Sequence, residues 1–151
     1  MKWYTTLYMF IGRYQHHLEE KGRLSIPKKF RSQLVDGAIL SKGLDGCLFL
    51  YPKVAWEALI NKVSALPLTQ ADARSFTRSL SHTAEEVTID GLGRILVPEF
   101  LRIEGELKTD VVVAGSINRI EIWDAKKYAQ YASQINSRLE EIAEKLNLPD
   151  N

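Results

Sequence analysis

Residues 19–27 read Glu-Glu-Lys-Gly-Arg-Leu-Ser-Ile-Pro, and residues 90–98 read Asp-Gly-Leu-Gly-Arg-Ile-Leu-Val-Pro. Both stretches begin with an acidic residue and continue through three turn residues that include a glycine. Both then show an arginine, two apolar or small residues, a β-branched residue and a proline. Because an apolar run precedes each stretch, the pattern predicts a hairpin turn in which Gly22 and Gly93 take the position with positive φ.

The segments on either side of these turns have the patterns of strands and short helices. Residues 9–18 alternate weakly, with Tyr14 and Leu18 on one face, which predicts a strand that enters the first turn. The prolines that close the two stretches end a strand and favour the start of a helix. We therefore expect helices at residues 28–34 and 99–103.

The similarity between the two halves extends beyond the turns. Arg31 and Arg102 stand at the same offset from the motif, and residues 39–51 align with residues 111–123. Each of these longer segments reads as an apolar strand, a glycine-containing turn and an alternating strand that ends in an aromatic residue, and a helix pattern follows. Two copies of one ββαββα unit are therefore predicted, and two copies favour one pseudo-symmetric domain over a solenoid.

Composition and length agree with one compact domain. The chain has 151 residues, of which 45% are hydrophobic and 26% are charged. No apolar run approaches the roughly 20 residues that span a bilayer, and residues 1–8 lack the pattern of a signal peptide. The single Cys47 has no partner for an internal disulfide, which favours a reducing cytoplasm.

Charge divides unevenly between the two copies. Residues 9–62 hold nine Lys or Arg against five Asp or Glu, whereas residues 82–128 hold six against nine. If the protein contacts a polyanion, the first copy is the better face. The alternative is that this asymmetry is drift on solvated surfaces.

The domain organisation follows from these segments. We expect a leader outside the repeat at 1–8, a first repeat with its helix at 9–66, a linker helix at 67–81, a second repeat with a C-terminal helix at 82–146, and a tail at 147–151. Thr69 and Asp72 resemble a capping box at the start of the linker helix. The last helix is expected to run unbroken over residues 125–146, with an apolar seam suited to packing on another helix.

Few residues suggest catalysis or metal binding. His16 and His17 are adjacent on a predicted strand and point to opposite faces, so they are poorly placed to ligate one ion. Cys47 lies in an apolar strand without a nearby histidine and reads as a small core residue. We therefore expect no enzyme activity, no catalytic or metal-binding residue, and no cofactor or small-molecule substrate.

The acidic residue and the arginine that flank each turn have two interpretations. They form an exposed ion pair that sets strand register, worth about 0.2–1 kcal/mol, or the arginine reaches a phosphate or a guanine edge. For Glu19 and Arg23, surrounded by lysines, DNA contact is favoured. For Asp90 and Arg94, which have acidic neighbours, the structural ion pair is favoured.

These motifs resemble the MraZ family. The resemblance rests on Phe10-x-Gly12-x-Tyr14-x-His16, on residues 21–31, and on the run Leu-Asp-Gly-Cys-Leu-x-Leu-Tyr-Pro at residues 44–52. It continues in Leu-Pro-Leu at 66–68, Asp-Ala-Arg at 72–74, Gly-Arg-Ile-Leu-Val-Pro at 93–98 and Glu-Ile-Trp at 121–123, and covers residues 9–146.

The resemblance implies an α+β fold, a tandem duplicated AbrB-like swapped-hairpin β-barrel with peripheral helices. It further implies a cytoplasmic, nucleoid-associated bacterial transcriptional regulator that forms ring-shaped homo-oligomers. Such a regulator binds short repeated elements in the promoter of its own division and cell-wall gene cluster.

The family motif is Asp-x-x-x-Arg in both copies, and this chain departs from it once. Asp90 and Arg94 keep the motif, whereas Glu19 replaces the aspartate that would precede Arg23. Residues 1–8 resemble nothing in the family and are expected to be dispensable.

Double-stranded promoter DNA is therefore the expected partner, and no membrane association is expected. The residues expected to contact DNA are basic and surround the first turn: Arg13, Lys21, Arg23, Lys28, Lys29 and Arg31. The rival interpretation is an oligomeric interaction module that does not bind DNA.

Overall fold

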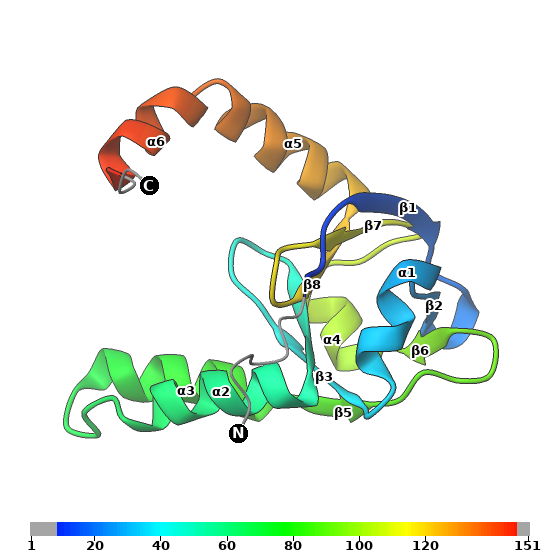
Figure 1. Cartoon of the computed structure of the whole chain (residues 1–151), viewed down its shortest axis with the longest axis horizontal. Coiled ribbons are helices and arrows are strands. Elements are labelled where there is room, and N and C mark those ends of the chain that lie inside the picture. Colours follow the sequence, from blue (N-terminus) through cyan, green and yellow to red (C-terminus); the bar gives the residue numbers. More distant parts are fainter. Residues whose placement is uncertain (1–8, 148–151) are drawn as a thin grey trace, which may run out of the picture.

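The computed structural model describes residues 9–147 of the chain. The expected leader and residues 148–151 of the expected tail lie outside the described residues. The described chain is a mixed α+β protein with a β-rich body, from which helices project (Figure 1). The expected α+β class is therefore confirmed.

The first copy has four strands and its helices in the predicted order. They are β1 (Arg13–His17), the short 3₁₀ turn η1 (Glu20–Gly22), β2 (Arg23–Ser25), α1 (Lys28–Arg31) with the 3₁₀ turn η2 (Ser32–Leu34), β3 (Ala38–Lys42), β4 (Leu48–Pro52) and α2 (Lys53–Ser64). The helix α3 (Ala71–Thr83) follows and leads into the second copy.

The second copy repeats this order. Its elements are β5 (Glu85–Val87), β6 (Arg94–Leu96), α4 (Glu99–Glu104), β7 (Asp110–Gly115), β8 (Ile120–Asp124), α5 (Ala125–Asn136) and α6 (Leu139–Leu146). The helices expected after the two prolines are α1 with η2, and α4.

Strands of the two copies are interleaved within one open sheet. The order is β1-β7-β8-β4-β3-β5, and all pairs are antiparallel. The first strand of each copy therefore pairs with the third strand of the other copy: β1 with β7, and β5 with β3. Neither copy has a sheet of its own, because each one supplies an edge strand to its counterpart.

A separate two-stranded ribbon joins the two motifs at residues 19–27 and 90–98. Strand β2 pairs with β6, with Leu24 opposite Ile95. Both predicted turns form: the amide of Gly22 donates to the carbonyl of Glu19 at 3.0 Å, and the amide of Gly93 donates to that of Asp90 at 3.0 Å. The prediction that each turn joins two paired strands is wrong. The strands on either side of each turn pair with strands of the other copy instead.

The main hydrophobic core lies between the large sheet, the ribbon and the short helices. Leu24 and Ile95 of the ribbon, Phe30 of α1 and Leu101 of α4 are all almost completely buried in it. One face of the sheet adds further apolar side chains: Leu40, Leu48, Leu50, Val111, Val113, Ile120 and Ile122. Burying one such side chain fully is worth about 1.5–3 kcal/mol, so this core depends on residues from both copies.

The opposite face of the sheet is covered by the longer helices. Cys47, Phe49 and Tyr51 form a second cluster with Val112, Ala114 and Trp123. Helix α2 packs on it through Trp56 and Leu59, and α5 packs on it through Tyr128 and Tyr131. Both sheet faces are thus buried, and α2 with α3 and α5 with α6 extend beyond the β-rich body (Figure 1).

Two helix predictions are wrong in detail. The last helix is interrupted at Ser137 and Arg138, so its apolar seam is divided: Tyr131 packs on the sheet, whereas Leu139 is 55% exposed on α6. The predicted capping box does not form either, because Gln70 is the N-cap of α3 and makes no side-chain capping bond. No helix within residues 9–147 is long and apolar enough to cross a membrane.

Each turn is held in place by the other copy. The carbonyl of Gly22 accepts a bond from the amide of Val97 at 2.8 Å, and the carbonyl of Gly93 accepts one from Ile26 at 2.9 Å. A Cβ atom on Gly22 would contact the carbonyl oxygen of Val97, and one on Gly93 would contact the guanidinium of Arg31. Glycine is required at both turns for positive φ and for this close approach.

Replacing Gly22 with alanine should destabilise the protein by more than about 2 kcal/mol, because it combines a left-handed backbone with a clash against a backbone carbonyl. Urea unfolding measures this change. Gly91→Ala is the matched control: a Cβ at Gly91 meets nothing within 4 Å, and its φ is not positive. Equal stabilities of the two variants would contradict the proposed contact.

Candidate nucleic-acid interface

The outer face of the β2–β6 ribbon carries side chains from both motifs. Leu24 and Ile95 point into the core, and therefore their neighbours along each strand point outward. Arg23 lies opposite Leu96, and Ser25 lies opposite Arg94. The pairing thus brings the two motif arginines, 71 residues apart in the sequence, onto one surface.

Arg94 is held by carboxylates. Its Nε donates to Asp90 Oδ2 at 3.1 Å, and its Nη1 lies 3.6 Å from Oε1 of Glu19, which belongs to the first copy. The other oxygen of Asp90 accepts the amides of Leu92 and Arg94, each at 2.9 Å. The backbone bond from Arg94 is the main reason that the pKa of Asp90 lies below its usual value, and the Leu92 amide and the guanidinium lower it further.

Arg23 has a different environment. Its side chain is exposed and makes no hydrogen bond or ion pair with the residues that the structure describes. The carboxylate expected to pair with it, that of Glu19, lies beside Arg94 instead. The Asp90–Arg94 ion pair was expected, and the pairing of Glu19 across the two copies was not.

Three predicted lysines flank Arg23 in the sequence. Lys21 occupies the tip of the first turn with a φ of 67°, and Lys28 lies at the start of α1; both are exposed. Lys29 is also exposed, and its Nζ lies 5.4 Å from the centre of the Tyr14 ring. The first turn and the helix after it therefore present three exposed cations on either side of β2 in the sequence.

The other two predicted contacts have partners within the protein. Arg13 on β1 donates from Nη1 to the hydroxyl of Tyr128 on α5 at 3.3 Å, and it lies 5.7 Å from the centre of that ring. Arg31 turns inward, and its Nε donates to the carbonyl of Ile26 at 2.8 Å while its guanidinium lies against Gly93. Arg31 therefore supports the second turn, and it is the least accessible of the six predicted residues.

Sequence reasoning did not select Ser25 and Leu96, which complete the outer face of the ribbon. For Ser25 the signal was present, because it stands between two apolar residues, whereas Leu96 stands in a continuous apolar run that gives no such signal. It was also missed that Arg102 would lie against Gly22 as Arg31 lies against Gly93. The equal offsets of these arginines from the motif were visible, but the exchange of strands that places each beside the other copy was not.

The residues considered for catalysis have structural surroundings. Cys47 is buried in the second cluster, and burial raises the pKa of its thiol far above the usual value. His17 lies 2.8 Å from the carboxylate of Asp110 at the exposed end of β1. Within residues 9–147, no group of three or more His, Cys, Asp or Glu side chains could hold a metal ion.

Exposed β-strands are one of the elements with which proteins read the grooves of DNA. The chain belongs to the MraZ family: the family model of the MraZ protein matches it twice, over residues 9–79 and 80–148.

Several curated relatives carry the name transcriptional regulator MraZ. The relative from Heliobacterium modesticaldum is 46% identical over 138 residues, which cover 91% of this chain and 96% of the relative. The relative from Alkaliphilus metalliredigens is 45% identical with the same coverage. The relative from Limosilactobacillus reuteri is 45% identical over 93% of this chain and 99% of its own length. A transcriptional regulator is not a class of enzyme.

The stability that the charge of Asp90 contributes should disappear in acid. Because its folded pKa is lower than its unfolded pKa, this contribution is present above the usual carboxyl pKa of about 4 and is lost as the pH falls through the folded value. Asp90→Asn should therefore be less stable than the parent at pH 7, and the difference should shrink towards pH 3. Urea unfolding at both pH values measures it, and a constant difference would contradict the charge argument.

Proposed function

We propose that this chain is a sequence-specific, double-stranded DNA-binding transcriptional regulator that contacts DNA through the β2–β6 ribbon and the basic turn before it. The observation that carries the proposal is the exposed Arg23 guanidinium, which has no carboxylate partner among the described residues and is flanked in the sequence by the exposed Lys21, Lys28 and Lys29. A planar guanidinium suits a phosphate or a guanine edge. The major groove admits a two-stranded ribbon.

The six predicted basic residues have different roles in this proposal. Arg23, Lys21 and Lys28 contact DNA directly, and Lys29 and Arg13 contribute positive charge beside them. Arg31 acts indirectly by holding the second turn, since its guanidinium faces Gly93. In fold terms, we propose an AbrB-like swapped-hairpin arrangement, with the repeats at residues 9–66 and 82–146 and the linker helix between them; the strand exchange between the copies supports it.

The proposed target is the promoter of the division and cell-wall gene cluster, and the proposed location is the nucleoid in the cytoplasm. This part rests on family membership and on the regulator name of the relatives. One ribbon of three-residue strands offers few contacts, so it should bind DNA weakly alone. A ring that presents several ribbons to several repeated promoter elements gains affinity by effective concentration.

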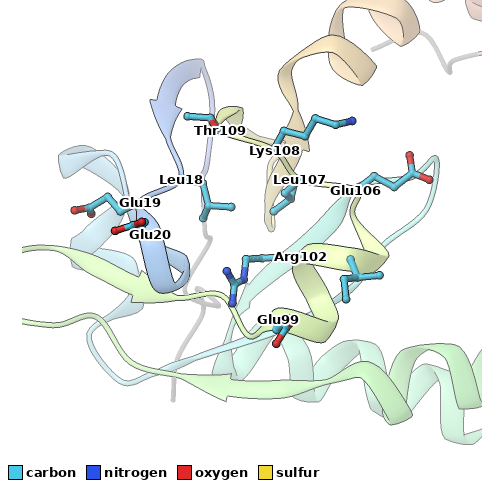
Figure 2. Close-up of a pocket in the computed structure, with 10 residues that line it drawn as sticks. Leu18, Glu19, Glu20, Glu99, Arg102, Glu106, Leu107, Lys108 and Thr109 are labelled. Carbon is cyan, nitrogen blue, oxygen red and sulfur yellow. The ribbon is translucent and has the colours of Figure 1, made fainter.

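The hollow beside α4 supports self-association (Figure 2). It measures about 550 Å³, and its rim carries more carboxylates than cations: Glu19, Glu20, Glu99 and Glu106 against Arg102 and Lys108. The corresponding positions of the two short helices also differ in character. Lys28 and Lys29 of α1 stand where α4 has Glu99 and the exposed Phe100.

The basic surface of α1 and the acidic surface beside α4 are complementary in charge, which favours a head-to-tail contact between neighbouring chains. The basic α1 of one chain would lie against the acidic and apolar α4 of the next. Such a contact closes a ring if the rotation between neighbours allows it. The rival function, an oligomeric interaction module, would use the same contact without binding DNA.

Salt dependence separates the two functions. Affinity for the protein's own upstream DNA should fall by about tenfold or more between 50 and 200 mM salt, since lysines and arginines that contact phosphates release counterions. Gel shifts across this range measure the change. The absence of a retarded complex even at low salt would favour the rival.

Arg23→Ala should weaken DNA binding by about 1–3 kcal/mol for each engaged subunit. It should change the free energy of unfolding by less than about 0.5 kcal/mol, because the side chain is exposed and unpaired among the described residues. Arg94→Ala is the matched control: it should alter stability or assembly and leave specific binding measurable. Gel shifts and thermal melts on both variants measure the two effects.

Two outcomes would overturn this assignment of roles. One is an Arg23→Ala variant that binds DNA like the parent. The other is an Arg94→Ala variant that stays folded and assembled but no longer binds.

Light scattering at micromolar concentration should find a multimer. Glu99→Lys should reduce the measured mass, because it places a cation where the basic α1 of the next chain is expected. Glu57→Lys on α2 is the control with the same charge change on an exposed helix outside the hollow, and it should leave the mass unchanged. A monomeric parent would exclude the ring.

A further inference from the structure

The two turns of the repeat use their acidic residues differently, although their backbones match. The amide of Glu19 donates to the carbonyl of Arg23 at 2.9 Å, as the amide of Asp90 donates to that of Arg94 at 2.8 Å. The Asp90 carboxylate folds back and accepts the amides of Leu92 and Arg94. Among the described residues, the Glu19 carboxylate accepts no amide of its own turn and extends to Arg94 instead.

Side-chain length explains this difference. An aspartate at the entrance of a turn is short enough to accept amides two and four residues later, as in Asx turns. Glutamate has one more methylene, which carries its carboxylate past the amides of its own turn. Because β2 and β6 are adjacent and antiparallel, the Glu19 carboxylate reaches Arg94 of the second copy.

We propose that Glu19 is a positioning residue that determines which of the two motif arginines faces DNA. By pairing with Arg94 across the ribbon, Glu19 leaves Arg23 without a carboxylate and gives Arg94 a second one. This inference rests on the proposed DNA-binding function and adds to it the residue that makes the two halves of the ribbon unequal.

The electrostatic consequence is local. Arg94, whose side chain is only 24% exposed, lies between Glu19 and Asp90, so one positive charge faces two negative charges. A phosphate that approaches Arg94 would meet net negative charge. Arg23 is exposed and has no carboxylate partner among the described residues, so a phosphate there would meet an unpaired positive charge.

The first test removes the charge of Glu19 while keeping its shape. Glu19→Gln should raise affinity for the promoter DNA by about two- to tenfold, because Arg94 then has one carboxylate partner and can contact phosphate. Glu20→Gln is the matched control: it makes the same charge change at the adjacent exposed position, which has no ion pair among the described residues. Gel shifts at one salt concentration compare the two.

The proposal requires that the gain in DNA affinity from Glu19→Gln depends on Arg94. In an Arg94→Gln background the gain from Glu19→Gln should vanish, whereas any effect of Glu20→Gln should persist. Equal gains from the two glutamine variants, or a gain that survives in the Arg94→Gln background, would mean that Glu19 acts only through overall charge and would overturn the proposal.

Glu19→Asp supplies the conservative variant. The shorter carboxylate should accept the amides of its own turn as Asp90 does, so it should leave Arg94 and approach Arg23. The loss of DNA affinity caused by Arg23→Ala should then become smaller than in the parent, and the loss caused by Arg94→Ala should become larger. Unchanged losses in the Glu19→Asp background would contradict the positioning role.

A measurement without DNA separates this inference from the proposed function. A double-mutant cycle on the free energy of unfolding should find coupling between Glu19 and Arg94 and none between Glu20 and Arg94. Coupling together with a parent that binds no DNA would reject the proposed function, and with it the role of Glu19 in DNA binding. DNA binding by the parent without any coupling would reject only the role of Glu19.

Discussion

The exchange of strands between the two copies is the constraint on which the rest of the structure depends. In each turn, the carbonyl of the glycine accepts a hydrogen bond from an amide of the other copy. The amide of Val97 donates to Gly22, and the amide of Ile26 donates to Gly93. The main core is shared in the same way, since Leu24 and Ile95 are buried side by side from the two copies. Unpaired buried amides and carbonyls are costly, so neither copy could keep this conformation alone.

This exchange also explains why charges from distant parts of the sequence meet. Pairing β2 with β6 places Arg23 and Arg94 on one surface and brings Glu19 within 3.6 Å of Arg94. The two arginines keep the same backbone position but have different partners. The fold thus makes two equivalent positions available, and a single methylene in one acidic side chain makes them unequal.

The shared core leaves the outer surfaces of the two copies free to differ. Phe30 of α1 and Leu101 of α4 occupy equivalent inward positions and are both buried. The exposed residues that precede them are Lys29 and Phe100, of which one is cationic and the other is apolar. Packing therefore requires apolar residues at the inward positions of both short helices. At the outward positions, α1 presents cations, and α4 presents a carboxylate and an apolar group that suit contact with a neighbouring chain.

The sequence by itself determined the repeat, the order of strands and short helices, and the glycines at the two turns. These features depend on local preferences, such as the alternation of apolar residues and the positive φ that glycine tolerates. It also identified the basic character of the first copy. The ion pair of Asp90 with Arg94 was predictable because the two residues flank one turn.

The tertiary structure alone decided which strands pair, where Arg31 points and which arginine Glu19 contacts. The strands on either side of each turn were expected to pair with each other, yet β1 lies beside β7 and β2 beside β6. Local sequence patterns favour a strand without specifying its partner, because pairing depends on burying both faces of the sheet over the whole chain. Arg31 turns inward partly for the same reason: the exchange brings Gly93 of the second copy against its guanidinium, beside the local bond to the carbonyl of Ile26.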